Sequence, residues 1–156
     1  MSEKNAEKAD KGEKTPGPQQ QLYQQLLTCL RGEWHSMVVV PASPGSSAAT
    51  VANALVEVST LVRGKKARLF STEGLGVNDV SKVIVDMMQH IGSGGLAIAS
   101  IDSVINAQSG IPVTLAVDVA LLVVQLGVTQ VDEARRTVEV VGEKKFLGAV
   151  TIESAT

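Results

Sequence analysis

The feature of this sequence that most restricts its fold is a short apolar run, a loop and a helix that follow one another without a gap. Residues 37–40 read Met-Val-Val-Val, which is typical of a buried strand, and residues 41–47 form a loop rich in proline, glycine and serine. The next segment predicts a helix that ends at Gly64, with an apolar face formed by Val51, Leu55, Val58 and Val62. In α/β domains that begin in this way, the loop after the first strand is where a ligand is expected.

The alternation of strands and helices continues along the chain. Strands are predicted at residues 67–71, 96–101, 119–124 and 146–152, and a short helix is predicted after Gly110. A helix from residue 19 precedes the first strand, with Leu22, Leu26 and Leu30 at helical spacing. This order predicts an α/β fold with a mostly parallel sheet and helices on both faces.

Two further helices have predicted apolar faces. The first face is formed by Val80, Ile84, Met87 and Ile91, and the second by Val131, Ala134, Val138 and Val141. Thr129, with Asp132 three residues later, is the predicted cap of the second of these helices.

Length and composition favour one domain of this class. The chain has 156 residues, of which 44% are hydrophobic and only 3% aromatic, as expected for strands of Val, Leu, Ile and Ala buried on both faces. Residues 1–18 mix charges with glycine and proline and predict a disordered tail. Residues 19–156 are therefore the expected single domain.

Charge and cysteine content exclude several classes of function. A formal net charge of −2 gives no drive toward nucleic acid or an anionic membrane. No signal peptide or membrane span is recognisable, so a cytoplasmic protein is expected. Cys29 is a predicted core residue, and neither His35 nor His90 has a metal ligand at suitable spacing, so no metal site is expected.

The loop after the first strand lacks most of what phosphate chemistry needs. In the pattern G-x-x-x-x-G-K-[ST], glycines let the backbone wrap phosphates, lysine neutralises them and the hydroxyl binds magnesium. Here the loop reads Pro44, Gly45, Ser46, Ser47, Ala48, Ala49 and Thr50, with Ala48 at the lysine position and Ala49 at the hydroxyl position. Two interpretations remain: backbone amides that attract an anion, or a turn that caps the helix through Ser46 or Ser47.

Several segments in order resemble the P-loop domain of bacterial tyrosine kinases of capsule and exopolysaccharide systems. Residues 21–30 are similar to the family's E-A-Y-R-x-L-R-T-N-L helix, and residues 42–55 to its S-x-x-P-G-E-G-K-S-T loop and helix start. Residues 118–124, Asp-Val-Ala-Leu-Leu-Val-Val, are similar to its D-G-V-L-L-V-V strand. The resemblance implies a shortened P-loop NTPase-like fold with degenerate Walker motifs. Tyr23 is the only tyrosine, so phosphorylation of a tyrosine tail is not expected.

The resemblance also indicates which acidic positions remain. The family's second strand ends in D-x-D, and Ser71 and Glu73 stand at those two positions. Its third strand delivers a magnesium-associated aspartate, where this chain has Ser100, with Asp102 two residues later. Glu73 and Asp102 are thus the residual acidic candidates.

Together these losses favour a non-catalytic, pseudokinase-like protein that works by protein–protein interaction. The resemblance implies that it regulates exopolysaccharide or envelope biosynthesis. The expected partner is a kinase, a membrane adaptor or a second copy, and the first helix, with Tyr23, Leu26 and Leu30, is a candidate interaction element. No catalytic residue and no cofactor is expected. The rival is an atypical ATPase or kinase that binds ATP and magnesium through Glu73 and Asp102 with a lysine such as Lys65 or Lys66. A third possibility is a regulator of the type of ATPase that positions chromosomes or the division site.

Overall fold

The computed structural model describes residues 17–153, and its sheet is entirely parallel. Five strands lie in the order β2-β3-β1-β4-β5. They are β1 (Ser36–Pro41), β2 (Ala67–Ser71), β3 (Leu96–Ser100), β4 (Val119–Leu126) and β5 (Phe146–Glu153). All five predicted strands are therefore present, within two residues at each end. The fold is the P-loop-like α/β fold that the sequence predicted.

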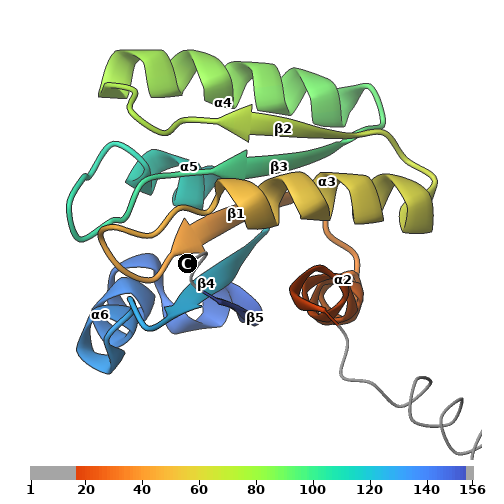
Figure 1. The fold of residues 1–156 in the computed structure, drawn as a ribbon. Helices are drawn as coiled ribbons and strands as arrows, with labels where there is room; N and C mark the ends of the chain where they lie inside the picture. Colours follow the sequence, from red (N-terminus) through yellow and green to blue (C-terminus); the bar gives the residue numbers. More distant parts are fainter. Residues whose placement is uncertain (1–16, 154–156) are drawn as a thin grey trace, which may run out of the picture.

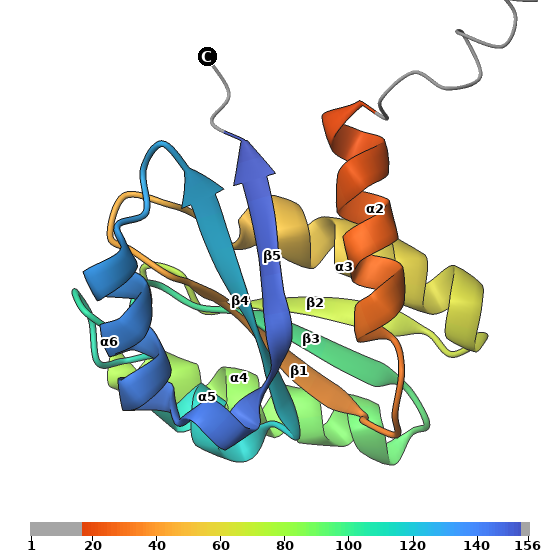
Figure 2. The ribbon, with the colours of Figure 1, turned by 90° about the horizontal axis from the view of Figure 1, so that it is seen from below.

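Helices cover both faces of this sheet, and Figure 2 shows α2 and α3 on one side with α4 and α5 on the other. The helices are α2 (Pro18–Cys29), α3 (Ala49–Arg63), α4 (Val77–Gly92), α5 (Ile111–Ala116) and α6 (Val131–Val141), and a 3-10 turn, η1 (Glu143–Lys145), precedes β5. The predicted tail, residues 1–18, falls almost entirely outside the described residues, and its last residue, Pro18, begins α2.

Strand β1 lies at the centre because its run of β-branched residues suits burial on both faces. Residues 36–41 are all buried, and β1 pairs with β3 on one side and β4 on the other (Figure 1). Its alternate side chains divide the core into two layers. Met37 and Val39 pack beneath α2 and α3, while Val38 and Val40 pack on the side of α4 and α5.

Three details of the helices differ from the sequence prediction. Val62 is 56% exposed, because the buried face of α3 extends only as far as Ser59. Val131 is 74% exposed, and Thr137 is the buried residue of α6. The capping box is formed by Gln130 and Glu133 instead of Thr129 and Asp132, one residue later than predicted. The hydroxyl of Thr129 is instead engaged by neighbouring loops, as described below.

Candidate functional site

The loop between β1 and α3 lies at the edge of the sheet where the parallel strands end, here called the carboxyl edge. From β1 the chain passes through α3 to β2 on one side of the sheet, whereas from the neighbouring strand β4 it passes through α6 to β5 on the other side. The loop after β1 therefore lies where the connections diverge, as at the ligand-binding crevice of open α/β folds. Gly45 has a φ of 88°, a conformation that glycine adopts without strain. The backbone path therefore depends on the one glycine that the loop retains.

Hydroxyl groups hold the loop against the neighbouring turn. Ser43 is fully buried, and its Oγ lies 3.0 Å from Thr129 Oγ1 and 3.4 Å from Ser46 Oγ. Thr129 Oγ1 also accepts a hydrogen bond from the backbone N–H of Gln125. Thr137 adds a further link, because its hydroxyl donates to the carbonyl of Ala42 at 3.0 Å. Ser43 and Thr129 were not expected to pair, since 86 residues separate them.

The start of α3 carries no cation. Ala48, at the expected lysine position, is fully buried and is the N-cap residue, with no side-chain cap hydrogen bond. Ser47 Oγ accepts a hydrogen bond from Ala49 N at 3.1 Å, while Ser46 Oγ donates to the Ser43 carbonyl. Within residues 17–153, no lysine or arginine hydrogen-bonds to this loop. Thr50 is exposed on the first turn.

The two lysines that could replace the missing P-loop lysine lie at the opposite edge of the sheet. Lys65 and Lys66 follow the end of α3 and precede β2, so they are at the edge where strands begin. Helix α3 has 15 residues and is about 22 Å long, and it separates these lysines from the loop. Neither lysine is placed to neutralise a phosphate at the carboxyl edge.

Two carboxylates gather beside the loop instead. Glu73 follows β2 and Asp102 follows β3, and Asp102 Oδ2 accepts a hydrogen bond from Gly74 N at 2.8 Å. Burial, and secondly the charge of Asp102, raise the pKa of Glu73, while the nearby hydroxyl of Ser47 lowers it. The structure thus brings the two residual acidic candidates together, next to the first turn of α3.

Ser100 stands at the position where the sequence resemblance implies an aspartate. It ends β3 and is 1% exposed, and its hydroxyl has no hydrogen-bond partner in the described part of the chain. Its backbone carbonyl accepts hydrogen bonds from both the N–H and the hydroxyl of Thr72. Among residues 17–153, no group of three or more His, Cys, Asp or Glu side chains could hold a metal ion.

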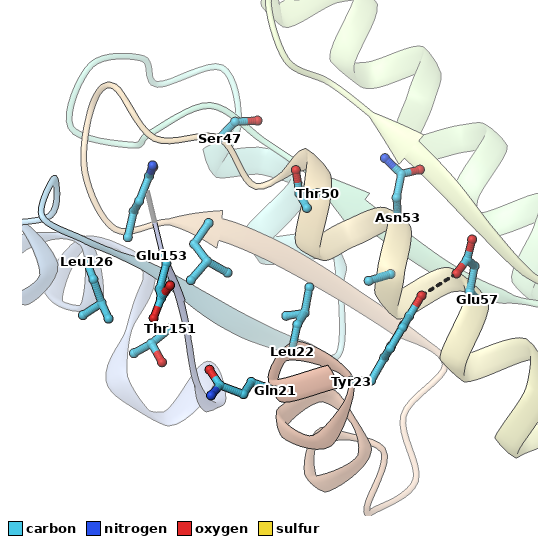
Figure 3. Close-up of a pocket in the computed structure, with 13 residues that line it drawn as sticks. Gln21, Leu22, Tyr23, Ser47, Thr50, Asn53, Glu57, Leu126, Thr151 and Glu153 are labelled. Atoms are coloured by element: carbon cyan, nitrogen blue, oxygen red, sulfur yellow. Dashed lines mark hydrogen bonds between the residues drawn. The ribbon is translucent and has the colours of Figure 1, made fainter. Parts of the chain in front are cut away.

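A cavity of about 620 Å³ opens beside the start of α3 (Figure 3). It lies between four elements that are distant in sequence: α2, α3, β4 and β5. Tyr23 and Glu57 lie side by side at one end of it, and the Tyr23 hydroxyl donates to Glu57 Oε2 at 2.8 Å. The sequence did not indicate this cavity, because nothing in the spacing of α2 shows that it packs along β5.

The residues of α2 that were predicted to bind a partner pack against the rest of the same domain. Leu26 is fully buried and Leu30 is 8% exposed, and both belong to the core beneath α3. Tyr23 is half-buried at the cavity. The exposed side of α2 includes Gln24 and Leu27, so a role of this helix in partner binding, which stays a prediction, would use that side.

Comparison with known proteins supports the fold. No family model matches the sequence, and no curated protein matches it. Among solved structures, this chain is similar to the chimerical protein CapA2B2, with a TM-score of 0.61 and 13% sequence identity. The match covers 82% of this chain and 80% of that one. In residues 17–153, none of the helices combines the length and apolarity that a membrane span requires.

Proposed function

We propose that this chain is a non-catalytic protein of P-loop-like fold that acts by binding another protein, in a cytoplasmic system that builds capsule or exopolysaccharide. The observation that carries the proposal is the charge at the carboxyl edge. The loop from Ser43 to Thr50 has no cation, and Glu73 and Asp102 lie beside it. A capsule system is what the sequence resemblance implies, and the likeness to CapA2B2 supports the fold.

Electrostatics favour partner binding over phosphoryl transfer. A P-loop lysine and its magnesium ion stabilise the transferred phosphoryl charge by several kcal/mol, and the described site supplies neither the lysine nor a counterpart. Each carboxylate near a bound phosphate would add repulsion, on the order of 1–4 kcal/mol per pair of charges at contact distance. The rival functions, an atypical ATP-dependent enzyme or a positioning-ATPase-like regulator, would both have to overcome this repulsion.

Calorimetric titration with ATP and magnesium tests the proposal. We expect no saturable heat at micromolar to millimolar ATP, and no release of phosphate from ATP. Gly45→Val is the matched variant, because a branched residue cannot follow the backbone at that φ without strain. Micromolar binding by the parent chain that disappears in Gly45→Val would place ATP at this loop and contradict the proposal.

A further inference from the structure

The cavity between α2, α3, β4 and β5 has the size and the mixed lining of a binding site. Its volume of about 620 Å³ lies within the usual range for sites that enclose a small group or a few side chains. Apolar side chains contribute to its wall from all four elements: Leu22, Ala54, Leu126 and Ile152. Amides of Gln21, Asn53 and Gln125 add hydrogen-bonding groups of both kinds.

Every charged side chain that lines this cavity is acidic. Glu57 comes from α3 and Glu153 from the end of β5, and no lysine, arginine or histidine is among the lining residues. One oxygen of Glu57 is oriented by the Tyr23 hydroxyl, and the described residues offer the other oxygen, Oε1, no hydrogen bond. The cavity therefore suits a cation with an apolar stem and disfavours a phosphate.

We infer that this cavity receives an arginine side chain of the protein partner, an inference that rests on the proposed function. The methylene groups of arginine would lie against the apolar wall, and its guanidinium would reach the carboxylates and amide oxygens. Arginine fits this lining better than lysine, because its five N–H donors match several separated acceptors.

The chain's own amino-terminal segment is a poor occupant on charge grounds. Residues 1–16 contain as many acidic as basic side chains, and an acidic residue directly precedes each lysine: Glu3 and Lys4, Glu7 and Lys8, Asp10 and Lys11, Glu13 and Lys14. The segment thus presents no net charge to an acidic cavity.

Amide chemical shifts of the full-length, nitrogen-15-labelled chain test this inference. The probe is N-acetyl-arginine N-methylamide, and the citrulline compound of the same shape, which has no charge, is its control. We expect the arginine probe to shift the amides of Asn53, Ala54 and Ile152 in a saturable manner, and the citrulline probe to leave them in place. Glu57→Gln and Glu153→Gln should each weaken binding about three- to tenfold, whereas Glu139→Gln, on α6 outside the cavity, should not.

Four outcomes would overturn the inference. They are equal shifts from both probes, no saturable shift, tighter binding of adenosine monophosphate to the same amides, or movement of these amides when the four lysines of residues 1–16 are changed to glutamine without any probe. The ATP titration separates this failure from that of the proposed function. If ATP does not bind and the arginine probe also fails, only the inference about the cavity is wrong.

Discussion

Arg63 fastens the end of α3 to the segment that joins α2 to β1. Its guanidinium donates to the carbonyls of Trp34, Leu30 and Gly32 at 2.8, 2.8 and 2.6 Å, and lies 4.2 Å from the centre of the Trp34 ring. Three carbonyls that no helix or strand pairs are thereby satisfied by one side chain.

Replacement of Arg63 should destabilise the fold more than replacement of a second stacked arginine. We expect Arg63→Met to lower the free energy of unfolding by about 2–3 kcal/mol, because the carbonyls lose a charged donor. Arg68→Met is the control, since Arg68 is exposed and only stacks on Phe70, and it should cost less than about 1 kcal/mol. Urea unfolding of both variants measures the difference, and equal losses would contradict this role of Arg63.

Glu73 gives a pH dependence of known sign. Because its pKa is raised in the folded chain, Glu73 binds a proton more readily when folded than when unfolded. It therefore favours folding at low pH and opposes folding once the pH rises through its folded pKa. Glu73→Gln should raise the free energy of unfolding at neutral pH, by less than about 1 kcal/mol, because Glu73 is only partly buried and solvent screens its charge.

The gain from Glu73→Gln should vanish as the pH falls below the range in which an ordinary glutamate titrates. Chemical denaturation across that range, compared with the exposed control Glu139→Gln, measures the effect. A gain that is larger in acid than at neutral pH would show that burial and Asp102 do not set the behaviour of Glu73.

At the scale of elements, α2 protects the outer edge of the sheet. Strand β5 is an edge strand, and the Gln25 side chain pairs with its backbone as another strand would. Gln25 Nε2 donates to the Thr151 carbonyl at 3.1 Å, and Gln25 Oε1 accepts from Thr151 N at 2.9 Å. An otherwise open edge, which could pair with other chains, is partly closed by one amide.

Removal of this amide should loosen β5. We expect Gln25→Ala to cost about 1–2 kcal/mol and to speed hydrogen exchange of the Thr151 amide. Gln24→Ala is the matched control, because Gln24 is the exposed neighbour on the same helix. Unchanged exchange at Thr151 in Gln25→Ala would contradict the pairing.

At the scale of the whole molecule, the edge where strands end is acidic, whereas the edge where strands begin carries charges of both signs, such as Lys66 and Asp118. Lys65 and Lys66 lie where strands begin, while Glu73, Asp102 and Glu153 lie where strands end. The four loops that follow β1, β2, β3 and β4 contain no lysine or arginine. A fold that resembles a phosphate-binding domain therefore presents an acidic surface at the edge where phosphate would bind.

Local patterns were sufficient to predict the strands and the loop after β1, because hydrophobic periodicity and turn residues act over short stretches. Glu73 and Asp102 were named from the family resemblance, not from such patterns. Such local patterns do not predict contacts between segments that are distant in the sequence. Thr129 was expected to cap α6 but bonds Ser43, and Gln25 looked like a surface residue but pairs with β5. The cavity depends on the same packing of α2 along β5, which no local spacing indicates.

The central claim is that the loop after β1 does not hold a nucleotide. The most direct measurement follows the backbone amides of Gly45, Ser46 and Ser47 in the nitrogen-15-labelled chain while ATP and magnesium are added to millimolar concentration. We predict that these three amides keep their chemical shifts, because no cation offsets the negative charges of Glu73 and Asp102. Saturable shifts of all three at micromolar ATP would contradict it.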